Sequence, residues 1–423
     1  MNRFVKIFLI IIFFGIVIFV VNKSNSSSNL QKYAEEVLAE CQAEKYRAGC
    51  YDREIPKLMD YISMEDAFAV TSIVQAQDKS YTYCHVLGHK LSAREIDKDP
   101  SKWKEVVTRC PSGICSNGCI HGGFQEKFRA ETFTDEQINK VKPDLMDLCE
   151  SRGNWRPTGL EQASCYHALG HLTMYLTAAD IDKSTTLCEE VAKKSDGRDF
   201  SQLCFDGAFM QIYQPLEPDD FALIKGKEID RSKLDSFCGQ FTGKKKGSCL
   251  SESWPIFRTE IINNPQELVK FCLKEANSEQ ERCFGGLFYV LTAQLNFDSL
   301  KIKNYCLGLP IDYQGLCFAN AATRMIETDY RNISLAVELC LSSRTDANKS
   351  LPAASSGVSQ RDKFDFRVHP RSKLRGILTK NKDACFNELV KYSTYNFHAG
   401  SKEFFSLCNG LPQKWKTKCL EKG

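Results

Sequence analysis

The chain has 423 residues and carries 56 basic against 53 acidic side chains, so its formal charge is only +3. Because the two signs are interleaved along the chain, the sequence predicts no nucleic-acid partner. Hydrophobic residues make up 43% of the chain. This fraction supports a buried core and excludes a wholly disordered protein, and the length is sufficient for two or three domains.

An apolar segment opens the sequence: residues 7–21 carry no charge, and Arg3 and Lys6 precede them. As a helix, residues 4–21 would span roughly 27 Å, close to the hydrocarbon core of a bilayer. Positive charge on the amino-terminal side predicts a membrane anchor with a cytoplasmic amino terminus and an extracytoplasmic bulk. We expect residues 1–29 to form this signal anchor and a polar tether. A cleaved signal peptide is the alternative, since Ser24 and Ser26 are small enough for a cleavage site.

Twenty cysteines follow the apolar segment, and an even number in an exported chain is typical of disulfides. Most fall into successive pairs that enclose eight, ten or fifteen residues. The first cysteine ends one amphipathic run and the second opens another, which predicts helical hairpins bridged across their turns. Counting alone selects no connectivity. The pairs favoured by the pattern are Cys41/Cys50, Cys84/Cys115, Cys110/Cys119, Cys149/Cys165, Cys188/Cys204, Cys238/Cys249, Cys272/Cys283, Cys306/Cys317, Cys340/Cys385 and Cys408/Cys419.

The runs that begin at the second cysteines align with one another, as in CIHGGFQ, CYHALGH, CFDGAFM, CFGGLFY and CFANAAT. They recur at intervals of roughly 34–46 residues, the period of stacked helical hairpins. This architecture resembles the cysteine-stapled repeats of the Sel1-like and tetratricopeptide families over residues 31–340. The resemblance implies a superhelix of paired helices with a concave binding surface, where we expect an extracytoplasmic protein or peptide as partner. It implies nothing about catalysis.

The predicted fold class is therefore all-α: a solenoid of disulfide-stapled helical hairpin repeats behind a single amino-terminal transmembrane helix. The repeat domain is expected to cover residues 30–342, with further helical repeats over residues 374–423. Residues 343–373 between them contain two prolines and many small polar residues, which predicts a flexible insertion. A recognition arm is the alternative for its basic, phenylalanine-bearing end.

Five of the seven histidines fall in equivalent places of the repeats. Two motifs, HVLGH and HALGH, place histidines four residues apart, so both imidazoles of a motif share one helix face, as in chelating metal sites. Gly88 and Gly170 lie on the same stripe and would let another helix or a ligand approach closely. The predicted metal ligands are His85, His89, His121, His167, His171 and Asp206.

Four further side chains are expected to lie around this site: Gln125, Glu126, Tyr166 and Met210. Imidazole with a carboxylate favours zinc or iron, while the amide and the thioether keep copper as an alternative. Haem is disfavoured because no CxxCH attachment motif occurs. An open coordination position would activate water with Glu126 or Asp206 as base, but no known catalytic motif is present, so the sequence leaves enzymatic activity open.

The other class of function is a non-catalytic scaffold that binds a protein or peptide. In that case the five histidines would be structural, hydrogen-bonded to carbonyl groups or to Tyr83 and Tyr166. His369 and His398 are isolated in the sequence and are expected to be ordinary surface residues.

Overall fold

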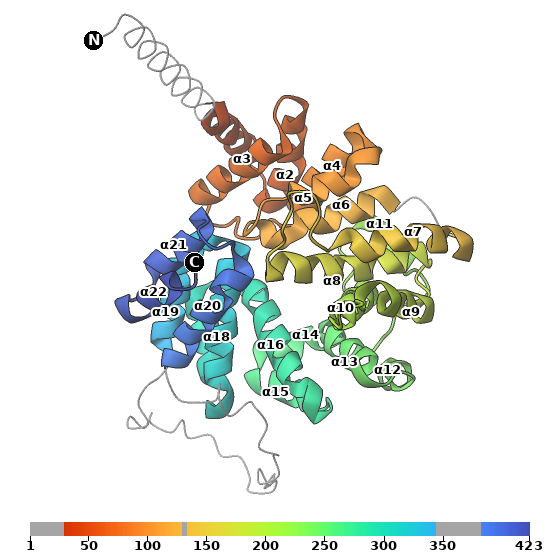
Figure 1. Ribbon diagram of the computed structural model, residues 1–423. Helices are drawn as coiled ribbons and strands as arrows, with labels where there is room; N and C mark the ends of the chain where they lie inside the picture. The colour runs from red at the N-terminus through yellow and green to blue at the C-terminus, as the bar shows by residue number, and fades with distance from the viewer. Residues whose placement is uncertain (1–28, 129–132, 344–381) are drawn as a thin grey trace, which may run out of the picture. The chain divides into compact units, whose positions relative to one another are not determined.

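The computed structural model describes residues 29–128, 133–343 and 382–423. These residues are helical and contain no β-strand, only three isolated bridges (Figure 1). The predicted anchor and nearly all of the predicted insertion lie outside the described residues. Within the described part of the chain, no helix is both long and apolar enough to cross a membrane.

The chain forms two compact units, of which the first comprises Met1–Pro111 and Asn117–Lys127. Residues 29–41 of this unit are helical. The helix over Met64–Gln77 is capped by Ser63, whose side chain accepts a hydrogen bond from the backbone N–H of Asp66. Two acidic residues in its first turn favour the same helix start. Its further helices are α2 (Arg47–Glu54), α3 (Met64–Gln77), α4 (His85–Lys98), α5 (Trp103–Thr108) and α6 (Gly118–Phe128).

The second unit comprises Ser112–Ser116 and Phe128–Gly423. Two of its helices begin with capping boxes, formed by Thr134 with Gln137 and by Thr158 with Glu161. In each box, the side chain of either residue accepts a hydrogen bond from the backbone N–H of the other. Its helices are α7 (Asp135–Leu148), α8 (Gly159–Leu176), α9 (Ile181–Ala192), α10 (Ser201–Tyr213), α11 (Pro218–Leu223), α12 (Leu234–Gly239), α13 (Gly243–Glu252), α14 (Arg258–Asn263), α15 (Pro265–Cys272), α16 (Asn277–Gln294), α17 (Ser299–Gly308), α18 (Ile311–Thr328), α19 (Ile333–Ser342), α20 (Lys382–Asn396), α21 (Lys402–Gly410) and α22 (Gln413–Leu420).

Disulfides close the helical hairpins, and their pairs coincide with those that the spacing predicts. Each has a Cα–Cα distance between 5.3 and 5.7 Å. Cys84 and Cys115 are disulfide-bonded as well, so none of the twenty cysteines is free. The bridges with these distances are Cys41–Cys50, Cys110–Cys119, Cys149–Cys165, Cys188–Cys204, Cys238–Cys249, Cys272–Cys283, Cys306–Cys317, Cys340–Cys385 and Cys408–Cys419.

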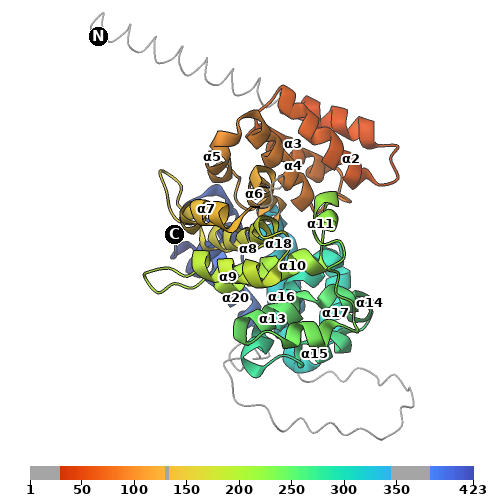
Figure 2. The ribbon, with the colours of Figure 1, turned by 90° about the vertical axis from the view of Figure 1, so that its right-hand side faces the viewer.

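The second helices of successive hairpins pack side by side in the second unit. Each of α8, α10, α13, α16, α18 and α20 contacts the next, and α20 returns to contact α8 (Figures 1 and 2). At this closure Gly159 of α8 lies against the ring of Tyr395 on α20. The hairpins expected from the sequence are present, but this row of helices closes into a ring, whereas the ends of an open solenoid would stay apart.

Candidate metal centre

Two helices of the first unit cross closely at glycines. A Cβ on Gly88 of α4 would come within 2.8 Å of the backbone nitrogen of Cys119 on α6. In the same way, Gly118 lies against the carbonyl oxygen of His85, and Gly122 lies against the backbone of His89. Only glycine allows two helix backbones to approach this far. The glycine of HVLGH therefore serves helix packing, one of the two roles expected for it.

This crossing brings three histidines together. His85 and His89 project from one face of α4, with their Nε2 atoms 3.1 Å apart. The ring of His121, on α6, lies 4.9 Å from that of His85 and 5.6 Å from that of His89, measured between centroids. One ligand nitrogen from each of the three lies within 4.8 Å of the others. This cluster contains three of the six predicted metal ligands.

The donor set and its spacing suit a transition-metal ion. Two nitrogens bound to one tetrahedral ion at about 2.0–2.1 Å would be about 3.3 Å apart, close to the separation found on α4. His85 and His89 are only 7% and 6% exposed, and His121 is partly buried. Tyr83 stacks against the ring of His85 at 5.8 Å. Three imidazoles would supply three ligands to a tetrahedral ion and leave the fourth position for water or another ligand.

The second motif lies in the other unit and forms its own pair. His167 and His171 of α8 have their Nε2 atoms 3.3 Å apart, and Nδ1 of His171 lies 2.6 Å from Oε1 of Gln211 on α10. Burial among protein atoms, and next the proximity of His171, lower the pKa of His167 from 6.5 to about 3. This imidazole is therefore neutral at physiological pH. The five histidines form two groups, one in each unit.

Asp206 does not join either histidine group. Its carboxylate forms an ion pair of 3.1 Å with Arg282 of α16 and accepts a hydrogen bond of 2.6 Å from Ser248 of α13. The histidine cluster of the first unit is the one group of three or more His, Cys, Asp or Glu ligands that the described residues contain. The expectation that Asp206 completes a histidine site is thus corrected: α10 turns this side chain toward α13 and α16.

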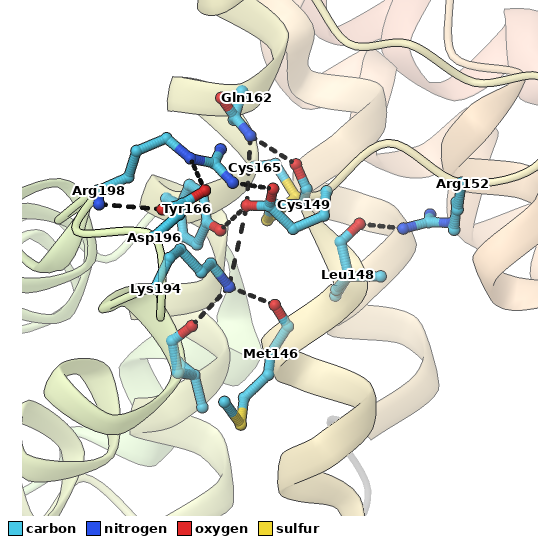
Figure 3. A network of polar contacts seen from close by, with 12 residues as sticks. Met146, Leu148, Cys149, Arg152, Gln162, Cys165, Tyr166, Lys194, Asp196 and Arg198 are labelled. Atoms are coloured by element: carbon cyan, nitrogen blue, oxygen red, sulfur yellow. Dashed lines mark hydrogen bonds and ion pairs between the residues drawn. A yellow bond between two sulfur atoms is a disulfide. The ribbon is translucent and has the colours of Figure 1, made fainter.

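The other expected neighbours are placed as follows. Glu126 of α6 is partly buried, and the side chain of Gln125 lies outside the described part of the structure. Tyr166 donates its hydroxyl hydrogen bond to Glu150, in the polar network of Figure 3. Burial would raise the pKa of Glu150, but hydrogen bonds from Tyr166 and Arg198 outweigh it and lower the value. This network joins the hairpin of Cys149 and Cys165 to Lys194 and Arg198, so Tyr166 has a bracing role.

A group of charges between helices of the second unit was not expected from the sequence. The ion pair of Asp206 and Arg282 joins α10 to α16, and Ser248 of α13 donates a hydrogen bond to the same carboxylate. Burial, and next Asp206, raise the pKa of the nearby Glu252, and burial raises the pKa of Glu275 to about 7. No sequence motif marks these positions, because the charges come from separate segments of the chain: α10, the end of α13, the bend before α16, and α16 itself.

His398 is half exposed, with Nε2 3.6 Å from Glu161, whereas His369 lies outside the described residues. No protein-family model, no curated protein and no solved structure matches this chain. The resemblance to Sel1-like and tetratricopeptide repeats therefore stays an architectural prediction, and the function must be argued from the site alone.

Proposed function

We propose that this protein is exported, anchored in a membrane by its amino-terminal segment, and binds a transition-metal ion through His85, His89 and His121. The observation that carries the metal assignment is the convergence of three imidazoles from two helices, with ligand nitrogens within 4.8 Å of one another. Disulfide bonding of all twenty cysteines supports the oxidising, extracytoplasmic location.

Zinc is the preferred ion for this site. Imidazole also suits iron and copper, but three histidines with one open tetrahedral position form the donor set of catalytic zinc sites. An ion held in this way would polarise a water or a substrate carbonyl in its fourth position. The protein supplies the geometry: α4 fixes two nitrogens at helical spacing, and the glycine crossing sets the third.

Zinc titration of the purified full-length chain tests this assignment. Replacing His121 with alanine removes one of three donors, so the zinc affinity of this site should fall at least about a hundredfold. His398→Ala is the matched control, because it removes an exposed imidazole and should leave zinc binding unchanged. Circular dichroism of both variants reports whether the helices persist. Equal zinc affinity in a folded His121→Ala variant and in the wild type would refute the site.

A further inference from the structure

The packing of α10 against α8 repeats that of α6 against α4. A Cβ on Gly207 of α10 would meet the carbonyl oxygen of His167, just as Gly118 meets that of His85. A Cβ on Gly170 of α8 would lie 2.6 Å from the backbone nitrogen of Ala208. The matching contact in the first unit joins Gly88 to the nitrogen of the residue after Gly118. The two helix pairs therefore share one register.

This register differs from that of the cysteines. If Cys119 is aligned with Cys204, Asp206 corresponds to His121. In the structure, however, Asp206 forms its ion pair with Arg282. If Gly118 is aligned with Gly207 instead, α10 shifts by four residues, or one helical turn, relative to α6. The residue three positions after the glycine is His121 on α6 and Met210 on α10. Met210 therefore occupies the helix position from which His121 reaches the two histidines of α4.

The next position on each helix also lies against the second histidine of its partner helix. The residue after His121 is Gly122, which lies against the backbone of His89. The residue after Met210 is Gln211, and its side chain contacts His171, the counterpart of His89, at 2.6 Å. These contacts give Met210 of α10 the helix position that His121 has on α6.

We propose that His167, His171 and Met210 form a second metal site, and that this site takes copper(I). The two Nε2 atoms are 3.3 Å apart, the separation expected when both bind one ion at about 2.0 Å. A thioether is a soft ligand that favours copper(I) over zinc, and the unbranched methionine side chain adapts readily to an ion. Met210 is partly buried, and Gln211 fixes the ring of His171 through its other nitrogen.

Copper(I) titration of the full-length chain, in competition with a colorimetric chelator and without oxygen, tests the proposal. Met210→Leu keeps the side-chain volume and removes the sulfur, so copper(I) affinity should fall at least about tenfold while zinc binding stays unchanged. Met325→Leu is the matched control: it removes a fully buried thioether from α18, and its copper(I) affinity should equal that of the wild type. X-ray absorption should show a sulfur neighbour of copper in the wild type and in Met325→Leu only.

The His121→Ala variant separates this proposal from the zinc site. It lacks one donor of the three-histidine cluster and keeps the second site intact, so it should still bind copper(I), and Met210→Leu in the same background should weaken this binding. Equal copper(I) affinity in Met210→Leu and Met325→Leu, or a copper shell without sulfur, would overturn the second site and leave the zinc site intact. Loss of all copper(I) binding in His121→Ala would also overturn it.

Discussion

Glu327 is a buried carboxyl group near the end of α18, and its side chain is only 5% exposed. Burial raises its pKa from 4.5 to about 7, although Arg324 and Asn396 act in the opposite direction. The folded chain therefore holds this proton more tightly than the unfolded chain does. At a pH between 4.5 and about 7, unfolding therefore releases this proton. The contribution of the protonated Glu327 to the stability of the fold is complete below about pH 4.5 and is lost as the pH rises through about 7.

Replacing Glu327 with glutamine should remove this dependence, because the amide is neutral at every pH. We expect the variant to gain stability over the wild type as the pH rises from 5 to 8, by roughly 1–3 kcal/mol. Thermal unfolding at the two pH values, with disulfides intact, measures the difference. Glu338→Gln, at an exposed position on α19, is the control. A gain of the same size in this control would contradict the burial argument.

The helix pairs α4/α6 and α8/α10 owe their close spacing to glycines at the crossings. Gly170 faces the backbone of α10, where an added Cβ would lie 2.6 Å from the nitrogen of Ala208 and 2.8 Å from the Cα of Gly207. Backbone atoms cannot move aside as a side chain can. The two helices must therefore separate when this glycine is replaced, and the residues on either side of the crossing move with them.

The Gly170→Ala variant should consequently be less stable than the wild type by about 1–3 kcal/mol. Gly286→Ala makes the same chemical change in the middle of α16, where an added Cβ meets nothing within 4 Å. The free energy of unfolding of this control should rise by up to about 1 kcal/mol, because alanine favours a helix more than glycine does. Denaturant unfolding of both variants compares them. A neutral Gly170→Ala would show that α8 and α10 do not require this close approach.

Disulfides and ring closure together hold the second unit. Except for Cys340–Cys385, with a sequence separation of 45, its bridges join cysteines 11 or 16 residues apart. Each bridge adds roughly 2–4 kcal/mol by restricting the unfolded chain. The contact of α20 with α8 joins elements more than 200 residues apart in sequence and completes the ring. Such a fold depends on an oxidising compartment, which agrees with the proposed extracytoplasmic location.

Protease treatment of intact cells tests this location on the whole molecule. We expect the protease to remove the folded part while the amino-terminal segment stays with the membrane, and no cysteine to react with an alkylating reagent before reduction. Recovery of a mature amino terminus near Asn25 would show that the segment is a cleaved signal peptide. Several reactive thiols in the exported protein would contradict the disulfide assignment.

The sequence by itself determined the elements and their covalent links. Helical periodicity, with a cysteine at the end of one run and the start of the next, predicts hairpins and their bridges because both signals are local. The HxxGH spacing likewise places His85 with His89, and His167 with His171, on single helix faces. These inferences require only the geometry of one helix and one turn.

Only the tertiary structure decided which residues from other helices meet these pairs. The cysteine alignment made Asp206 the counterpart of His121, but the glycine crossings shift α10 by one turn and send Asp206 to Arg282. Ring closure by α20 was equally hidden. Both outcomes depend on how helix surfaces pack over long sequence separations, and that packing is set by the combined shape of many side chains, which no local pattern records.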